Sequence, residues 1–217
     1  MKIALIGATG FVGSAILKEA LSRDHQVTAI LRHPEKLKLQ NKNLSVVQGD
    51  VMDSEKLTGL LNGNDIVVSA YNAGWNNPNI YNDFLKGSQS IQEAAKKSGI
   101  KRLIVMGGAG SLFIKPGVQL IDTPGIAEFA KAGSQAARDY LNILKKDDQL
   151  DWTFISPAIE MGKASSGTRT GKYRTGSDSP VFDASHKSSI SVEDLAVAAI
   201  DEVENPKHIR QRFTVGY

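Results

Sequence analysis

The sequence predicts an α/β fold with a doubly wound, mostly parallel sheet and helices on both faces, built as a single domain. Three observations carry this prediction. Short apolar segments alternate with amphipathic ones along the chain, which is the pattern of strands joined by helical crossovers. A glycine-rich turn joins the first strand to the first helix. The length of 217 residues and the hydrophobic fraction of 41% suit one compact unit, so we expect residues 1–217 to fold together.

Seven short segments rich in Val and Ile are the expected strands. Most of them lack a polar residue at every second position, which is typical of parallel strands that helices cover on both faces. Right-handed crossovers between such strands build a doubly wound sheet. In chain order the expected strands are residues 2–6, 26–31, 44–47, 65–69, 102–106, 152–155 and 212–215.

Five amphipathic segments between these strands are the expected helices. The first places Val12 and Ile16 on one face at helical spacing. Asp53 precedes the second helix as an expected N-cap, and Ser191 precedes the last in a pattern close to a capping box. The expected helices are residues 11–23, 54–61, 81–98, 128–146 and 192–203.

Two long segments interrupt this alternation. Residues 107–125 are rich in Gly and contain two Pro, and residues 157–189 are rich in Gly, Ser and Thr. Loops of this length are uncommon in compact domains unless they serve a function. Ligands of open α/β sheets bind beyond the carboxyl ends of the strands, where such loops gather. We expect residues 157–189 to form a substrate-side loop region; the alternative is a pair of ordinary surface connections.

The residue content excludes several classes of protein. With 26 basic and 23 acidic residues the net charge is only +3, so we expect no nucleic-acid partner. The absence of cysteine excludes disulfides, iron–sulfur clusters, Cys-ligated zinc and thiol nucleophiles. The four His are scattered without metal-binding spacing, so we expect no metal site. No apolar run approaches a membrane span and no signal-peptide pattern is present, so we expect a cytoplasmic protein without membrane contact.

The turn after the first strand has the glycine spacing of a dinucleotide-binding fingerprint. Its residues are Gly7, Ala8, Thr9, Gly10, Phe11, Val12 and Gly13. The first glycine permits the tight turn, the second allows backbone to approach a pyrophosphate, and the third lets helix and strand pack closely. Exposed N–H groups and the helix dipole then bind the phosphates. The alternative is a purely structural turn, but the position between a strand and an amphipathic helix favours a Rossmann-type site.

The end of the second strand bears on the choice of cofactor. NAD sites of this fold usually carry an acid about 20 residues after the glycine turn, where it binds the ribose 2′-hydroxyl. Here Arg32 and His33 stand at that point without an acid, and Lys36 follows one turn later. A guanidinium binds a 2′-phosphate through two charge-assisted hydrogen bonds. We therefore expect NADP(H) rather than NAD; the alternative for Arg32 is a solvated loop residue.

With these features the chain resembles the atypical short-chain dehydrogenase/reductase superfamily, most of all its small NAD(P)H-binding proteins related to biliverdin and flavin reductases and to nitrogen-metabolite repressors. The resemblance covers essentially the whole chain. It includes residues 31–36, 49–51, 151–157 and 190–196. It implies that Asp50 and Val51 contact adenine and that Arg32 contacts the 2′-phosphate. Ser69, Ala70 and Tyr71 would then contact the cofactor ribose.

The sequence departs from the standard reductases of this superfamily at the catalytic helix. Those enzymes carry Tyr-x-x-x-Lys after the fifth strand, where the tyrosine supplies a proton. Here Ala127 replaces the tyrosine and Lys131 is retained. We expect Lys131 to position the cofactor ribose, and Ser111 or Tyr173 to bind substrate. A solvated surface lysine is the alternative for Lys131.

These residues predict a reductase that transfers hydride to a small flavin-, quinone- or carbonyl-type acceptor, because flavins and quinones need no strong protein acid. Two alternatives stay open: a non-catalytic redox sensor that binds NADP(H), and an epimerase or dehydratase.

Two further groups of residues concern the substrate. Four basic residues without an acid in residues 163–177 favour an anionic acceptor or the cofactor phosphates, with a solvated flap as the alternative. They are Lys163, Arg169, Lys172 and Arg174. Tyr71, Trp75 and Tyr81 are expected to line the pocket beyond the fourth strand. The oligomeric state is not predicted.

Overall fold

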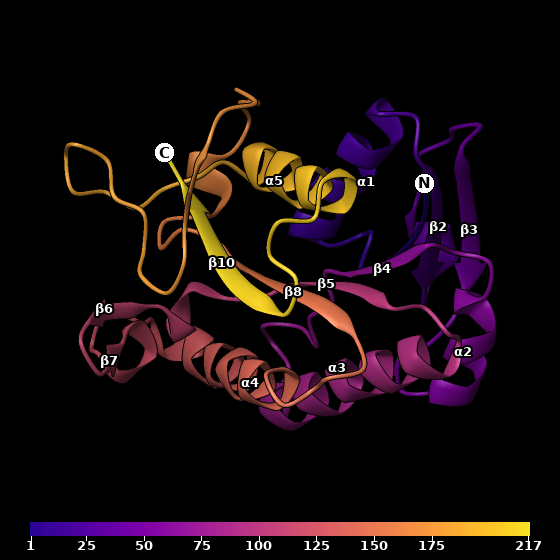
Figure 1. The fold of residues 1–217 in the computed structure, drawn as a ribbon, viewed down its shortest axis with the longest axis horizontal. Coiled ribbons are helices and arrows are strands. Elements are labelled where there is room, and N and C mark those ends of the chain that lie inside the picture. Colours follow the sequence, from indigo (N-terminus) through magenta and orange to yellow (C-terminus); the bar gives the residue numbers. More distant parts are fainter.

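The computed structural model describes residues 1–217 and contains an eight-stranded sheet between two layers of helices (Figure 1). The strand order is β3-β2-β1-β4-β5-β8-β10-β9. All neighbouring strands are parallel except β9, which runs antiparallel to β10. The strands are β1 (Lys2–Ile6), β2 (Gln26–Leu31), β3 (Leu44–Gln48), β4 (Ile66–Ser69), β5 (Arg102–Met106), β8 (Asp151–Ser156), β9 (Arg174–Gly176) and β10 (Gln211–Gly216). The prediction of a doubly wound, mostly parallel sheet is confirmed.

Each face of the sheet carries its own helical layer and its own hydrophobic core (Figure 1). Along β1, Ile3 and Leu5 pack in the core under α1 and α5, whereas Ala4 and Ile6 pack under the other three helices. This two-sided burial explains the unbroken apolar runs of the central strands. The helices are α1 (Phe11–Ser22), α2 (Ser54–Leu61), α3 (Ile80–Lys97), α4 (Glu128–Leu144) and α5 (Val192–Glu204). None of these helices is both long and apolar enough to cross a bilayer.

The expected strands and helices are all present, and no end differs by more than two residues from the expected one. Both predicted caps are confirmed. The Asp53 carboxylate accepts a hydrogen bond from the Lys56 amide at 3.0 Å, and the Ser191 hydroxyl accepts one from the Asp194 amide at 3.0 Å. These local signals are sufficient because a cap acts within a single turn of chain.

The two long segments contain structure that the sequence reasoning missed. In residues 107–125, β6 (Phe113–Lys115) and β7 (Val118–Gln119) form a small hairpin that turns at Gly117, whose φ is +74°. In residues 157–189, β9 adds an antiparallel edge to β10. Such short strands depend on their partner rather than on a sequence pattern of their own. Strand β3 also differs from the buried strands, because it lies at the opposite edge with Ser45 and Val46 exposed.

Candidate functional site

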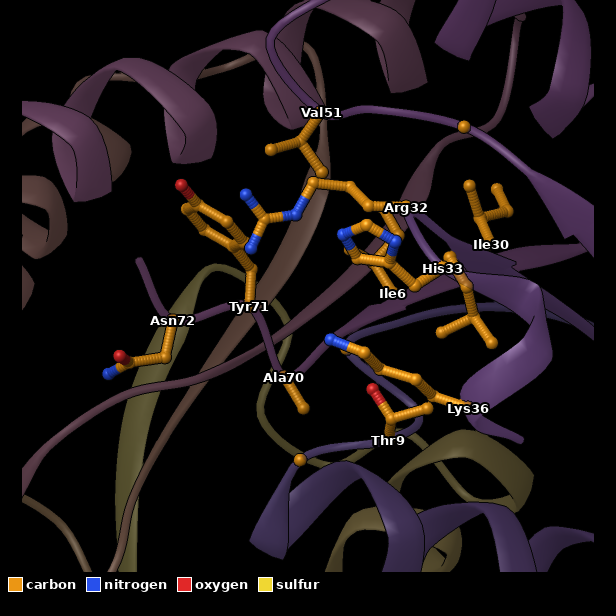
Figure 2. Close-up of a pocket in the computed structure, with 14 residues that line it drawn as sticks. Ile6, Thr9, Ile30, Arg32, His33, Lys36, Val51, Ala70, Tyr71 and Asn72 are labelled. Atoms are coloured by element: carbon orange, nitrogen blue, oxygen red, sulfur yellow. The ribbon is translucent and has the colours of Figure 1, made fainter. Parts of the chain in front are cut away.

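The candidate site is a cleft at the point where the strand order reverses. From β1 the chain continues to β2 on one side and later enters β4 on the other side. Open α/β sheets bind ligands beyond the carboxyl ends of the strands at such a switch point. The segments that follow β1, β2, β3 and β4 surround the cleft (Figure 2). Its lining residues are Ile6, Gly7, Thr9, Gly10, Ile30, Leu31, Arg32, His33, Lys36, Gly49, Val51, Ala70, Tyr71 and Asn72.

The glycine turn is shaped so that two of its glycines have no room for a side chain. Gly7 has a φ of +85°, and a Cβ there would lie 2.4 Å from the Ala70 carbonyl oxygen. A Cβ on Gly13 would lie 2.0 Å from the carbonyl oxygen of Gly7. Gly10 is the N-cap of α1, and its own amide donates to the Gly7 carbonyl at 2.9 Å. The turn therefore brings bare backbone to the cleft, as close approach of a ligand requires.

The first turn of α1 leaves backbone donors without partners. The amides of Phe11, Val12 and Gly13 have no acceptor within the protein, because Gly10 offers no side chain to cap them. Together with the positive end of the helix dipole, such amides form an anion site that suits a pyrophosphate. The side chains of Phe11, Val12 and Gly13 do not line the cleft. The contacts expected between these residues and the cofactor are therefore made by their backbone amides at the edge of the cleft.

The ionisable side chains that line the cleft, apart from Tyr71, are all basic. Arg32, His33 and Lys36 line it, and none of its lining residues is an acid. The Arg32 guanidinium has no ion pair or hydrogen-bond partner and lies beside the Tyr71 ring (Figure 2). The Lys36 amine also points into the cleft (Figure 2). His33 forms an ion pair with Glu35 at 3.2 Å when it is protonated. Unpaired cations in an acid-free cleft attract an anionic ligand such as a phosphate.

Of the residues after β3, Val51 lines the cleft and Asp50 forms a hydrogen bond within its own turn. Val51 is buried and lines the cleft, as an apolar contact for a ring would. The Asp50 carboxylate lies just outside the lining and accepts a hydrogen bond from the Met52 amide at 2.9 Å. Its second oxygen has no hydrogen-bond partner in the protein. The predicted adenine contacts of Asp50 and Val51 therefore stay predictions with geometry that permits them.

The residues after β4 form the far wall of the cleft. Ala70 and Tyr71 line it, whereas the buried Ser69 lies behind them and accepts a hydrogen bond from the Tyr71 amide at 3.5 Å. The Tyr71 ring stacks on Phe84, with ring centroids 6.0 Å apart, and a Cβ on Gly87 would lie 2.5 Å from it. Burial raises the pKa of Tyr71 to about 12, against the opposing charge of Arg32. Tyr71 is thus a neutral, fixed wall at physiological pH.

The two expected catalytic residues lie outside this cleft. Lys131 is on an exposed face of α4, where its amine contacts the Glu128 carboxylate at 2.5 Å. Ser111 is only 2% exposed, and its hydroxyl accepts a hydrogen bond from the Arg212 guanidinium at 3.2 Å. Because Ser111 is already engaged inside the protein, its role as a substrate contact has no geometric support here. Both assignments stay predictions.

The four basic residues of the second long segment are not gathered over the cleft, and none lines it. Arg169 donates two hydrogen bonds of 2.8 Å to the buried Glu19 carboxylate on α1. This hydrogen bonding from Arg169 holds the pKa of Glu19 below its ordinary value despite burial. Arg174 donates to the backbone carbonyls of Phe182 and Tyr217. These two cations therefore hold the segment to the protein, a role that spacing alone could not distinguish from ligand binding.

The aromatic residues expected beyond β4 also divide. Tyr71 lines the cleft, but Trp75 and Tyr81 do not, and the Tyr81 hydroxyl donates a hydrogen bond to the Asp139 carboxylate at 2.9 Å. Tyr173, an expected substrate contact, also lies outside the cleft lining, and its hydroxyl donates to the Asp201 carboxylate at 2.6 Å. Sequence reasoning did not single out Asn72, Gly49 or the apolar residues Ile6 and Ile30 as lining residues. Their signal is positional, because each lies at or just after a strand end that meets the glycine turn.

Comparisons with known proteins agree with this geometry. Residues 7–206 match the family described as NAD(P)H-binding. The chain is 37% identical to the uncharacterized protein YwnB of Bacillus subtilis over 99% of this chain and 98% of that protein. The solved structure of a candidate epimerase from Bacteroides thetaiotaomicron has 46% identity and a TM-score of 0.91, covering 100% of this chain and 96% of that one. A candidate NADH-flavin reductase from Streptococcus pneumoniae has 32% identity and a TM-score of 0.86, covering 100% and 99%. The chain belongs to this NAD(P)H-binding family, within the atypical short-chain dehydrogenases/reductases.

Proposed function

We propose that the protein is an NADPH-dependent reductase that transfers hydride to a small flavin-, quinone- or carbonyl-type acceptor. The observation that carries the cofactor choice is the unpaired guanidinium of Arg32 in a cleft without an acid. A carboxylate at this position would accept a hydrogen bond from a ribose 2′-hydroxyl, whereas a guanidinium binds a 2′-phosphate. The structure of a candidate NADH-flavin reductase, similar over the whole chain, supports the choice of acceptor class.

The residues present fit a nicotinamide dinucleotide. The bare backbone of Gly7 and Gly10 lines the cleft and would allow the close approach of a pyrophosphate, and the free amides of residues 11–13 would bind it. Arg32 and Lys36 would hold the 2′-phosphate, and the Tyr71 ring lies beside the Arg32 guanidinium in the wall of the cleft. When bound, the cofactor supplies the hydride. We assign to Lys131 the positioning of the nicotinamide ribose, which requires its amine to leave Glu128.

The acceptor class follows from what the chain lacks at the reaction centre. Ala127 stands where related reductases carry a tyrosine acid, and the Ser111 hydroxyl is held by Arg212. A carbonyl needs a proton from the protein as it is reduced, whereas a flavin or quinone takes hydride first and a proton from water. When bound, NADPH would supply the hydride and become NADP⁺, and water would supply the proton that the reduced acceptor also gains. Flavins and quinones are therefore favoured over carbonyls.

An acceptor screen tests this proposal. Loss of NADPH absorbance is followed with FMN, riboflavin, menadione and a set of aldehydes, each with and without protein. The expected result is turnover with at least one flavin or quinone, faster with NADPH than with NADH. Tight NADPH binding without turnover of any acceptor would overturn it.

A redox sensor is the second candidate, and one observation favours it. The side chains predicted to act in catalysis are engaged within the protein, Lys131 with Glu128 and Ser111 with Arg212. A sensor needs cofactor binding alone, which the cleft provides. Partner capture from cell extract that changes with the ratio of NADPH to NADP⁺, together with the absence of turnover, would select this function.

A further inference from the structure

The segment after β4 reaches from the cofactor cleft to a second exposed feature. Its first residues, Ala70, Tyr71 and Asn72, line the cleft. Three residues later the Trp75 side chain is 51% exposed, although Trp is among the most valuable residues to bury. The segment ends where α3 begins at Ile80, so it spans the carboxyl edge of the sheet where ligands of this fold bind.

Hydrogen bonds within the segment fix its shape. Asn72 accepts from the Gly74 amide at 2.7 Å, and Gly74 adopts a φ of +101°. The side-chain amides of Asn77 and Asn79 each donate to the Asp83 carboxylate at 2.8 Å. The Trp75 side chain is therefore presented on a braced loop rather than on a loose one, and such preorganisation lowers the entropy cost of binding.

The same anchor serves the cofactor wall. The Tyr71 hydroxyl donates to the backbone carbonyl of Asp83 at 3.1 Å, so Asp83 holds both ends of the segment. Tyr71 lines the cleft, and Trp75 lies four residues further along the same hydrogen-bonded segment. The two aromatic side chains thus have a fixed relation to one another.

Trp75 forms an open corner with Phe129 from the first turn of α4. The two ring centroids are 6.4 Å apart and the ring planes meet at 82°. The Trp75 ring packs against α4 at Gly133, where a Cβ would lie 2.8 Å from it. Phe129 is 71% exposed. A flat ring can stack on one wall of this corner while its edge contacts the other.

The size of the corner favours a small ligand over a protein partner. A Trp or Phe side chain buries roughly 150–250 Å², so the exposed parts of the two rings amount to roughly 300 Å² at most. Stable protein interfaces bury roughly 800 Å² on each partner. The exposed charges of Glu128 and Lys131 flank Phe129, which further limits the apolar area.

We propose that the Trp75–Phe129 corner binds the planar ring of the acceptor, which makes these two residues specificity determinants for flat aromatic acceptors. This inference rests on the proposed reductase function and names its acceptor-binding surface. The corner selects flat rings by stacking on Trp75 or Phe129.

Tryptophan fluorescence tests the corner without any turnover. The chain has two Trp, and Trp152 is only 2% exposed with its indole N–H donating to the Asp147 carbonyl. The NADP⁺-loaded protein is titrated with menadione and, separately, with FMN. We expect saturable quenching in the wild type and none in Trp75→Phe, whose remaining emission comes from Trp152. Equal quenching in both proteins, or none in the wild type, would overturn the proposal.

Kinetics give the second readout. Trp75→Ala and Phe129→Ala are expected to raise the acceptor KM about ten-fold while the NADPH KM stays within about two-fold, because stacking on one aromatic ring is lost. Trp75→Phe keeps a ring and is expected to retain most of the affinity. Ile209→Ala removes a comparable exposed apolar side chain elsewhere and is expected to change neither constant.

The outcomes separate this inference from the function on which it rests. If no acceptor is reduced, the reductase function fails, and the quenching titration still decides whether the corner binds flat rings. Acceptors could instead be reduced while Trp75→Ala has a wild-type melting temperature and leaves the acceptor KM unchanged. In that case the reductase function stands, and the assignment of the Trp75–Phe129 corner as the acceptor site is wrong.

Discussion

Gly13 offers the sharpest test of how the glycine turn is built. A Cβ at this position would lie 2.0 Å from the Gly7 carbonyl oxygen and 2.7 Å from its carbonyl carbon. Backbone atoms cannot rotate away as a flexible side chain can, so α1 must move by roughly 1.4 Å before the first contact reaches an ordinary 3.4 Å. Overpacking of this kind costs about 2–3 kcal/mol. For a chain of this length, Gly13→Ala should lower the melting temperature by about 4–12 °C.

The same displacement moves the free amides at the start of α1 away from the pyrophosphate position. We therefore expect Gly13→Ala to weaken NADPH binding by at least about ten-fold, measured by isothermal titration calorimetry on protein that is still folded. Gly59→Ala is the matched control, because Gly59 lies in α2 with no atom within 4 Å of its added Cβ. That variant should be stabilised by about 0.5–1 kcal/mol and bind NADPH normally. A wild-type melting temperature and affinity for Gly13→Ala would refute the reasoning.

Three further variants test the charges of the site and the fold. Arg32→Ala should weaken NADPH binding about 10- to 100-fold and NADH binding less than about three-fold, because only the 2′-phosphate loses charge-assisted bonds; equal losses by calorimetry would contradict this. Lys131→Ala should have a melting temperature within about 2 °C of the wild type, since an exposed ion pair contributes little to stability. The same variant should have a lower kcat, and an unchanged kcat would show that Lys131 is not part of the active site. Burial would raise the pKa of Asp194, but hydrogen bonds from Thr170 and Tyr217 outweigh it and hold that pKa below its ordinary value. The Asp194 carboxylate therefore stabilises the fold above about pH 4, and this contribution is lost as the pH falls further. The melting temperature of Asp194→Asn should be about 4–8 °C below that of the wild type at pH 7, and the two melting temperatures should converge in acid. A difference in melting temperature that does not change with pH would contradict this.

The sheet was predictable because its signals are local and repeated. Each central strand is apolar on both faces, as Ile3 and Ala4 illustrate, since the helices on both sides bury successive residues. The glycine turn was predictable because its geometry leaves no alternative to glycine at positions 7 and 13. Strand β9 could not be predicted, because a three-residue strand forms only where β10 offers it an edge.

The site was only partly predictable, for a related reason. Arg32 and Arg169 are both basic residues outside helices, and the sequence predicts an anion contact for each of them. In the structure Arg32 is unpaired in the cleft, whereas Arg169 is bound to Glu19, a residue 150 positions away. Whether a charge is free for a ligand depends on such distant partners. The corner of Trp75 and Phe129 likewise joins two segments that no sequence pattern links.

A single-turnover experiment tests the central claim most directly. The protein, in excess over NADPH, is mixed anaerobically with menadione in a stopped-flow instrument, and NADPH oxidation is compared with the reaction without protein. We predict that one quinone is reduced for each NADPH consumed, at a rate that saturates with quinone and falls in Trp75→Ala and Arg32→Ala. NADPH that binds but is oxidised no faster than in the absence of protein would contradict the assignment of the protein as a reductase.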